Sequence, residues 1–389
     1  MTQTIAHQAG RPDFGHAAET VLTKQDFARA AAEITAWDGY AATPLHSLPA
    51  LAAETGVAEI LYKHEGPRFG LGSFKALGGA FAGLGVLQRE LSQRLDREVS
   101  LESVRAGSYA EEVARITLAS ATDGNHGRSL AWGCKRLGAP CRIFIHAEVS
   151  EGRAKAIRGF GAEVVRVEGD FDASVDRCRE EAEANGWFVV SDTSWPGYAD
   201  PPRDAMSGYG VMVREIVDAM DAAPTHVFLQ AGCGGLAASV AAALRQAWGA
   251  RSPRVVIVEP DLAACLFESA RQGRMASVEI GEESIMAGLS CGVPSPMAWE
   301  ILRSEASDFL IISDDLIPPA VRGLARPRGS DPLIAAGESG VAGLAALTEA
   351  CKDPGLMRKL GLAAQSRVLL IGSEGVTDPE IHVRIMAGA

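Results

Sequence analysis

Short runs of β-branched and aliphatic residues alternate with longer amphipathic or Ala-rich stretches along this 389-residue chain. Between Cys141 and Asp192, three strand-like runs (CRIFIHA, AEVVRVEG and WFVVSD) are separated by two helix-like segments (SEGRAKAIRGFG and DASVDRCREEAEANG). Strands that alternate with helices in this way are typical of a parallel sheet covered by helices. The region therefore predicts one compact βαβαβ unit, in which Ser150 is placed to cap the first helix.

A second series of the same kind follows the Pro- and Gly-rich stretch 194–210. Its strand-like runs are 225–230 (THVFLQ), 254–260 (RVVIVEP), 308–314 (DFLIISD) and 367–372 (RVLLIG). We therefore expect an α/β fold with two open, mostly parallel twisted sheets flanked by helices. The stretch 194–210 predicts a crossing segment with a hinge, and the polar stretch 88–115 predicts a surface insertion of solvated helices.

The chain is acidic: 49 Asp and Glu residues face 37 Lys and Arg residues, the net charge is −12, and no cluster of basic residues stands out. This balance argues against nucleic acid or an acidic membrane as a partner and favours small-molecule chemistry. No run approaches the roughly 20 apolar residues of a membrane span, and the N-terminus lacks a secretory signal, so we expect a cytoplasmic protein. Seven scattered cysteines without a C-x-x-C pair predict neither a disulfide framework nor a metal site.

Lys75 lies in the segment RFGLGSFKALGGAFA, directly after Phe74 and before a helix-compatible run of small residues. Apolar neighbours partly remove water from the amine, which prepares it to form a Schiff base. Taken alone, a lysine on a helix is more often a solvated surface residue. Lys75 is therefore a candidate nucleophile, and the motifs around it decide whether this interpretation is favoured.

The segment QAGCGGLAA, residues 230–238, follows a predicted strand and opens a predicted helix. Glycines let backbone N–H groups approach a phosphate, and the helix N-terminus adds partial positive charge. Two alternatives stay open. One is a dinucleotide site, because Glu259 ends the next strand where a ribose-binding carboxylate falls, and the other is a structural turn. A dinucleotide site leaves Lys75 and the turn TDGNHG without a function, so we favour a phosphate site.

The turn TDGNHG, from Thr122 to Gly127, also opens a predicted helix. Its N–H groups are suited to a substrate carboxylate. Asn125 can donate a side-chain hydrogen bond, and His126 is expected mainly to support the loop. An acidic side chain, Asp123, in the middle of such an anion-binding turn requires an explanation.

Together, SFK, TDGNHG and GCGGL, in that order, resemble the fold type II enzymes that depend on pyridoxal 5′-phosphate, the tryptophan synthase β-subunit-like family. The resemblance covers most of the chain, from about Thr43 to Gly375. Four further segments are similar to those of the diaminopropionate ammonia-lyase branch: 191–198 (SDTSWPGY), 285–296 (IMAGLSCGVPSP), 337–344 (GESGVAGL) and 372–378 (GSEGVTD). The combination is specific, although each motif alone is not.

The resemblance implies a role for each matching residue. Lys75 forms the Schiff base with the cofactor, next to Phe74, and Asn125 bonds the cofactor's 3′ oxygen. Ser373 is the expected partner of the pyridine nitrogen, and Glu338 either organises the cofactor side of the site or caps the start of a helix. The phosphate loop consists of Gly232, Cys233, Gly234, Gly235 and Leu236. The substrate is expected to lie against Thr122, Asp123, Gly124, Asn125, His126 and Asp192.

The resemblance also implies an organisation of the chain. We expect a large cofactor-binding domain of residues 1–87 and 204–389, a small mobile domain of residues 88–203, and an active site in the cleft between them. The family resemblance implies a homodimer. We expect no metal ion.

In the dehydratase relatives the position of Asp123 generally carries a small neutral residue. An acid there suits a substrate with an additional cation, or a reaction with a second base, and both fit 2,3-diaminopropionate. The resemblance implies α,β-elimination of the D and L forms to pyruvate and ammonia, with Lys75 and Asp123 as bases on opposite faces. Asp192, at the end of WFVVSD, is expected to hold the departing β-ammonium, although on spacing alone it is a turn carboxylate.

Two other activities are compatible with the same cofactor: dehydration of serine, threonine or 3-hydroxyaspartate, and racemisation of an amino acid. Asp123 and Asp192 together favour an amine over a hydroxyl as the leaving group, and release of pyruvate separates a lyase from a racemase. A cofactor-bearing binding protein is disfavoured, because Lys75 and both aspartates are present. Cys265 and Cys291 are expected to be buried thiols rather than a redox pair.

Overall fold

The computed structural model describes residues 4–122, 124–326 and 328–388. Backbone contacts group the chain into two compact units. The first unit contains the chain up to Lys24, Ala41–Phe74 and the chain from Met212 onward, and the second contains Gln25–Tyr40 and Lys75–Val211. These bounds differ from the expected division after residues 87 and 203, because the helix that begins at Lys75 continues without a break to Leu95.

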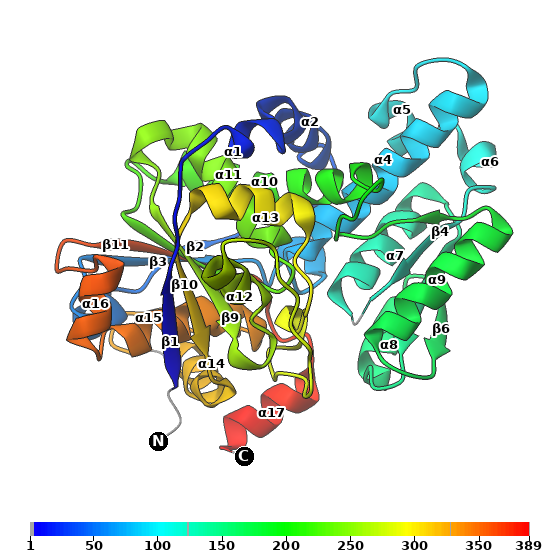
Figure 1. The fold of residues 1–389 in the computed structure, drawn as a ribbon. Coiled ribbons are helices and arrows are strands. Elements are labelled where there is room, and N and C mark those ends of the chain that lie inside the picture. Colours follow the sequence, from blue (N-terminus) through cyan, green and yellow to red (C-terminus); the bar gives the residue numbers. More distant parts are fainter. Residues whose placement is uncertain (1–3, 123, 327, 389) are drawn as a thin grey trace. The chain divides into compact units, whose positions relative to one another are not determined.

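The first unit is built on a mixed sheet. Its strands are β1 (Ile5–Ala9), β2 (Leu45–Ser47), β3 (Glu59–His64), β8 (His226–Gln230), β9 (Arg254–Pro260), β10 (Ala306–Ile312) and β11 (Arg367–Gly372). In the described part of the chain these strands form a seven-stranded sheet in the order β1-β10-β9-β8-β11-β3-β2 (Figure 1). The five inner strands run parallel, and β1 and β2 close the edges antiparallel to their neighbours. The four predicted strands of the second series are thus confirmed, within two residues at their ends.

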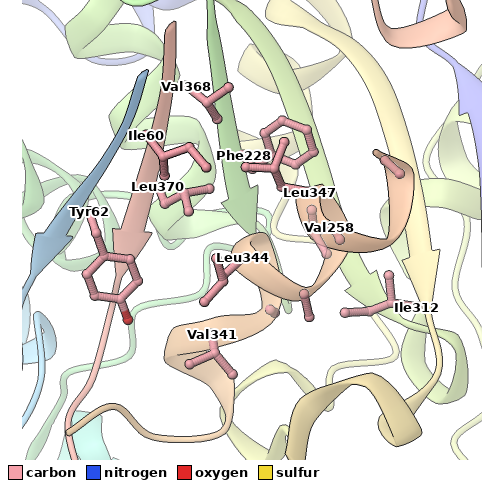
Figure 2. Close-up of a cluster of buried hydrophobic side chains, with 14 of the residues drawn as sticks. Ile60, Tyr62, Phe228, Val258, Ile312, Val341, Leu344, Leu347, Val368 and Leu370 are labelled. Atoms are coloured by element: carbon pink, nitrogen blue, oxygen red, sulfur yellow. The ribbon is translucent and has the colours of Figure 1, made fainter. Parts of the chain in front are cut away.

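Helices cover this sheet, and α15 packs against its centre. The helices of the first unit are α1 (Ala17–Thr20), α3 (Pro49–Thr55), α11 (Gly235–Trp248), α12 (Cys265–Gln272), α13 (Pro296–Glu305), α14 (Ile317–Ala325), α15 (Ala342–Ala350), α16 (Pro354–Leu360) and α17 (Pro379–Ala387). Figure 2 shows Leu344 and Leu347 of α15 pointing toward Phe228 of β8 and Leu370 of β11, all buried. Each such side chain stabilises the fold by about 1.5–3 kcal/mol, so this core fixes the two strands whose ends carry candidate site residues.

The second unit is built on a parallel sheet. Its strands are β4 (Leu118–Ala121), β5 (Cys141–His146), β6 (Glu163–Val167) and β7 (Phe188–Val189), and its helices are α2 (Lys24–Ile34), α4 (Lys75–Leu95), α5 (Leu101–Arg105), α6 (Ala110–Val113), α7 (Asn125–Leu137), α8 (Glu151–Arg158) and α9 (Phe171–Asn185). Helix α10 (Asp200–Ala219) begins in this unit and belongs to the first unit from Met212 onward. Among the described residues the strand order is β6-β5-β4-β7, and all pairs are parallel. The predicted βαβαβ unit is confirmed, and Ser150 Oγ accepts the Arg153 N–H at 3.3 Å as the cap of α8.

The expectation of a hinge over 194–210 is wrong for its second half. Helix α10 begins at Asp200, and Pro201 and Pro202 fill its first turn, where a missing N–H costs no hydrogen bond. A Cβ on Gly208 would lie 2.2 Å from the carbonyl oxygen of Leu77 on α4. Proline and glycine in this stretch therefore start a helix and allow close helix packing, instead of breaking the chain direction.

Small residues bring α4 and α7 close together. A Cβ on Gly79 would lie 2.8 Å from Ser129 Oγ and 3.1 Å from the carbonyl oxygen of His126. Ser129 Oγ also accepts a hydrogen bond from the Ala80 N–H at 3.1 Å. Because these contacts lie within the first two turns of both helices, the N-terminus of α4, with Lys75, is held beside the N-terminus of α7. Within the described ranges, no helix is both long and apolar enough to cross a membrane.

Candidate active site

Lys75 is the first residue of α4, and the residue before it is tied to the end of β11. The Phe74 N–H donates to the carbonyl oxygen of Ser373 at 2.9 Å. The Lys75 side chain is 23 % exposed, and its Nζ forms an ion pair and hydrogen bond with Oδ2 of Asp192. The fold therefore joins an amine and a carboxylate that lie 117 positions apart in the sequence.

Asp192 lies just beyond β7, in a loop that Tyr198 fastens. The Tyr198 hydroxyl donates to the carbonyl oxygen of Val189 at 2.9 Å and accepts the Ser191 N–H at 2.8 Å. Its ring stacks on Trp195 with ring centres 3.8 Å apart and planes 5° from parallel. These contacts hold the backbone on both sides of Asp192, which gives the motif SDTSWPGY a structural reason.

The charge of Asp192 depends on the groups that face it. Burial raises the pKa of the Asp192 carboxyl, but the positive charge of Lys75, and to a smaller extent His126, more than offsets burial and holds the pKa well below its usual range. The carboxylate is therefore ionised at neutral pH. It is only 19 % exposed, so it attracts a cation more strongly than a fully solvated carboxylate would.

The turn after β4 is closed by its own threonine. Thr122 Oγ1 accepts hydrogen bonds from the Gly124 N–H at 3.1 Å and the Gly127 N–H at 3.3 Å. A Cβ on Gly127 would lie 2.3 Å from Thr122 Cγ2, so glycine is required there. Asn125 follows as the first residue of α7. Asp123 lies outside the described residues.

His126, in the first turn of α7, is buried and faces two groups. Its Nε2 lies 2.8 Å from the carbonyl oxygen of Val190, and its Nδ1 lies 3.7 Å from Asp192 Oδ2. The contact with Val190 is of the supporting kind that the sequence predicts for this residue. Asp192 thus contacts both His126 at the start of α7 and Lys75 at the start of α4. These contacts bring the turn 122–127, the start of α4 and the loop after β7 together within the second unit.

The glycine loop lies in the first unit between β8 and α11. Gly234 has a φ of +97°, in the left-handed region that favours glycine, and is the N-cap of α11. The first N–H groups of a helix, here from Gly235 and Leu236, have no acceptor within the helix. Gly232 and Cys233 before them are half-buried. A tight glycine turn at a helix N-terminus is a site for a phosphate.

Glu259 has a structural contact that argues against the dinucleotide alternative. Its carboxyl is completely buried and accepts the Leu266 N–H at 2.8 Å and the Phe267 N–H at 2.7 Å, at the start of α12. Burial raises the pKa of Glu259 to about 8. A carboxyl enclosed in this way caps a helix and is not available to a ribose.

Ser373 lies just beyond β11 and is buried. Its Oγ accepts a hydrogen bond from Gln230 Nε2 at 2.9 Å, and the same amide donates to the carbonyl oxygen of Ile371 at 2.6 Å. Gln230 ends β8 directly before the glycine loop, so it connects two neighbouring strand ends that both carry predicted cofactor residues. The sequence analysis missed Gln230, because its partner lies 143 positions away.

Glu338 is buried at the start of the 3-10 helix Ser339–Val341, and its side chain makes no capping hydrogen bond there. Glu374 Oε1 accepts the Ser339 N–H at 3.1 Å instead. The capping alternative for Glu338 is therefore wrong. Glu374, which stands in the motif GSEGVTD, performs that function and was missed as a separate residue.

The cysteines are free thiols. Cys265 is buried, as expected, with its Sγ 3.7 Å from the carbonyl oxygen of Gly232. Cys291 is half-buried rather than buried. Its thiol hydrogen-bonds to Cys233, and this contact together with burial raises the pKa of the Cys291 thiol. Protonated thiols of this kind are weak nucleophiles.

Taken one unit at a time, the residues suit pyridoxal phosphate. The first unit has a glycine loop at a helix N-terminus and a serine at the end of the neighbouring strand, and the second unit has the lysine amine of Lys75. The glycines of the loop leave room that a Cβ would fill, as Gly232 shows, where a Cβ would lie 3.2 Å from Leu289 backbone atoms. Among the described residues, no group of three or more His, Cys, Asp or Glu side chains is placed to hold a metal ion.

Residues 36–373 match the family described as "Pyridoxal-phosphate dependent enzyme". The chain is 40 % identical over 347 residues to the diaminopropionate ammonia-lyase of Escherichia coli (strain K12), which covers 87 % of this chain and 86 % of the relative. The crystal structure of the holo form of an Escherichia coli diaminopropionate ammonia-lyase matches with a TM-score of 0.89 at 34 % identity, over 99 % of this chain and 97 % of that one.

A second structure of the Escherichia coli enzyme, in complex with an aminoacrylate-PLP azomethine reaction intermediate, matches with a TM-score of 0.88 at 35 % identity, over 98 % of this chain and 96 % of that one. The chain therefore belongs to the diaminopropionate ammonia-lyase family of the pyridoxal-phosphate-dependent enzymes. It is a lyase, and its cofactor is pyridoxal phosphate.

Proposed function

We propose that this chain catalyses the α,β-elimination of ammonia from 2,3-diaminopropionate, in its D and L forms, and that water hydrolyses the enamine product to pyruvate and a second molecule of ammonia. The relatives named diaminopropionate ammonia-lyase support the substrate. The single observation that carries the assignment of the residues is the ion pair between Lys75 Nζ and Asp192 Oδ2. It places a primary ammonium against a fixed carboxylate, which is the contact that the β-ammonium of this substrate requires.

Pyridoxal phosphate, when bound, withdraws electrons from the α-carbon of the substrate and makes its proton acidic. The N–H groups of 232–236 and the N-terminus of α11 hold its phosphate, and Asn125 bonds its 3′ oxygen. Ser373 Oγ meets the pyridine nitrogen. The Gln230 amide supports this role, because it fills an acceptor position on Ser373 Oγ and leaves the O–H free to donate. Glu338 organises the same side of the site.

Two bases serve the two enantiomers. Lys75 Nζ takes the α-proton from one face of the substrate, and Asp123 Oδ takes it from the other. A positioned base of this kind contributes about 10²–10⁴-fold to the rate. The close packing of α4 on α7 supports the proposal, because it sets Lys75 beside the turn that contains Asp123.

Asp192 acts on the leaving group. Its carboxylate holds the β-nitrogen as an ammonium. When the bond between the β-carbon and nitrogen breaks, the electron pair stays on nitrogen and ammonia departs. A neutral amine would leave poorly, so the charge of Asp192 is part of the chemistry. The low pKa of Asp192 supports this role.

Pyruvate release tests the proposal, with D- and L-2,3-diaminopropionate as substrates and D- and L-serine and threonine alongside. The wild type is expected to turn over both diaminopropionates faster than the hydroxy amino acids. In Asp123→Asn the rate of pyruvate release from the D form falls by about 10²–10⁴-fold, and the rate from the L form is unchanged. In Asp192→Asn the rates of pyruvate release from both forms fall.

Asp176→Asn, at an exposed aspartate on α9, is the matched control and leaves both rates unchanged. A preference for serine or threonine with diaminopropionate inert contradicts the proposal and makes the chain a dehydratase. Interconversion of the two enantiomers without pyruvate makes it a racemase.

The homodimer and the cytoplasmic location belong to the same proposal. The family resemblance supports the first, and scattered cysteines without a C-x-x-C pair support a reducing compartment for the second. Light scattering on the eluting peak of a size-exclusion column measures the mass, and a mass close to 40.8 kDa contradicts the dimer.

A further inference from the structure

The His126 ring lies between a backbone carbonyl group and a carboxylate. Its Nε2 is 2.8 Å from the carbonyl oxygen of Val190, and its Nδ1 is 3.7 Å from Asp192 Oδ2. The residue is 5 % exposed, and Nδ1 has no hydrogen-bond partner among the residues that the structure describes. A carbonyl oxygen can only accept a hydrogen bond, so Nε2 carries a hydrogen.

With a hydrogen on Nε2, Nδ1 presents either a lone pair or a second N–H to Asp192. A lone pair would face the ionised carboxylate across 3.7 Å, and these two electron-rich groups repel each other where screening is weak. A second N–H makes the ring an imidazolium opposite a carboxylate in a place where opposite charges are poorly screened. The geometry therefore favours the doubly protonated ring.

The importance of this charge depends on Lys75. In the structure Lys75 Nζ is the close partner of Asp192, yet the same nitrogen is the one that the family's chemistry commits to the cofactor. Tyr198 is the other titratable group of the Asp192 loop. Burial raises the pKa of its hydroxyl, which stays neutral. Among the described residues, His126 is then the positive group that remains opposite Asp192.

We propose that His126 is a positioning residue that keeps Asp192 ionised and oriented while Lys75 is bonded to the cofactor. In this role it is an imidazolium, fixed by the Val190 carbonyl at one nitrogen and turned to Asp192 at the other. The proposal rests on the proposed role of Asp192 in holding the β-ammonium and deepens it. Asp192 exchanges one cationic partner for another when the cofactor is bound, and the substrate meets a charged carboxylate.

Nitrogen NMR of the holoenzyme labelled with ¹⁵N-histidine tests the protonation of His126 without any substrate. The His126 signals are assigned by their absence in His126→Gln. We expect both ring nitrogens at the chemical shift of protonated nitrogen at pH 7. In Asp192→Asn, Nδ1 moves to the shift of an unprotonated nitrogen, whereas Asp176→Asn leaves both signals in place.

The pH profile tests the consequence for Asp192. The glutamine amide of His126→Gln can still donate to the Val190 carbonyl but cannot carry a positive charge. We expect the variant to keep the visible absorbance of the bound cofactor. The acid limb of kcat/KM shifts upward by about one pH unit or more, equivalent to a roughly fivefold or greater loss of rate at the pH of the wild-type midpoint.

An Nδ1 that is unprotonated at pH 7 in the wild-type holoenzyme overturns the proposal, and so does an acid limb that stays in place in His126→Gln. If His126→Gln loses the cofactor or does not fold, the NMR comparison of wild type with Asp192→Asn decides alone: the proposal then requires that one histidine has both ring nitrogens protonated at pH 7 and loses the proton on Nδ1 in Asp192→Asn. Because that comparison uses no substrate, its result is independent of whether diaminopropionate is turned over, and the pH profile can be measured with whichever amino acid is.

Discussion

Lys63 and Lys75 both pair with carboxylates, and the two pairs differ in their surroundings. In the first unit, Lys63 Nζ contacts Glu215 Oε2 at 2.5 Å and the Thr43 carbonyl oxygen at 2.7 Å. The guanidinium of Arg68 donates to both oxygens of Glu215 and to both oxygens of Glu65. Both cations are about 1 % exposed, so every charge in this group is enclosed and has several partners.

In the second unit, Lys75 and Asp192 form a pair that is partly open. Their side chains are 23 % and 19 % exposed, and the nearby Nδ1 of His126 has no hydrogen-bond partner among the described residues. The same two chemical groups therefore occur once in a closed network and once in an open one. The comparison teaches that enclosure of the side chains, rather than the presence of an ion pair, separates the structural lysine Lys63 from the candidate nucleophile Lys75.

The largest expected effect is on activity, at the open pair. Lys75→Ala is expected to lower kcat/KM by at least about 10³-fold, because it removes the amine that we propose as a base. Lys75→Ala also costs about 0–1 kcal/mol in the free energy of unfolding, because the pair of Lys75 with Asp192 is partly solvated. Initial rates of pyruvate formation measure kcat/KM, and urea unfolding measures the free energy. Activity within tenfold of wild type would remove Lys75 from the mechanism.

The next largest effect is on stability, at the closed network. Glu215→Gln leaves the buried cations of Lys63 and Arg68 with the carboxylate of Glu65 alone, so the free energy of unfolding is expected to fall by about 3–5 kcal/mol. Urea unfolding measures the loss. At temperatures where the variant is folded, its kcat/KM stays close to that of the wild type.

A surface pair is the control for Glu215→Gln. The Glu163 side chain is 56 % exposed and contacts Arg142 at 2.8 Å, so Glu163→Gln is expected to cost about 0–1 kcal/mol. Equal losses in the two variants would contradict the distinction between closed and open pairs.

The smallest effect is a pH dependence of the closed network. Burial raises the pKa of Glu215, but Arg68 and Lys63 more than offset burial and hold the pKa below its usual value of 4.5. A carboxyl with a lowered pKa stabilises the folded state above that usual value, and this stabilisation is lost as the pH falls through the folded-state pKa. Unfolding free energies measured from about pH 5 to pH 3 are expected to fall in the wild type and to fall less steeply in Glu215→Gln. Parallel slopes would assign the acid sensitivity to other carboxyls.

The sequence predicted four of the five inner strands of the first unit's sheet because of how they are buried, but it missed the inner strands β3 and β4. A parallel strand covered on both faces carries a nearly continuous aliphatic run, as RVVIVEP and RVLLIG do. The edge strands β1 (IAHQA) and β2 (LHS) gave no such signal, because they are short, polar and only half-buried. The error at 194–210 has a similar cause, since a proline pair reads as a break but is also compatible with the first turn of a helix.

The site could be predicted where a motif names its residue and not where two distant residues meet. Lys75 and Asp192 were each identified from local sequence, but their contact spans 117 positions. The hydrogen bond from Gln230 to Ser373 and the network around Arg68 likewise depend on how strands are ordered in the sheet. No spacing along the chain encodes that order, so such partners become visible only in the folded structure.

The antiparallel pairing of β1 with β10 has a practical consequence. β1 is joined to β10 from Ile5↔Ile312 to Ala9↔Asp308 (Figure 1). Without β1, the largely buried strand ASDFLII would present a long row of unpaired N–H and C=O groups, and such edges recruit other chains into aggregates. Residues 5–9 therefore protect this edge from pairing with other chains, and a truncation that removes β1 or a tightly fused tag is a poor choice when this enzyme is produced.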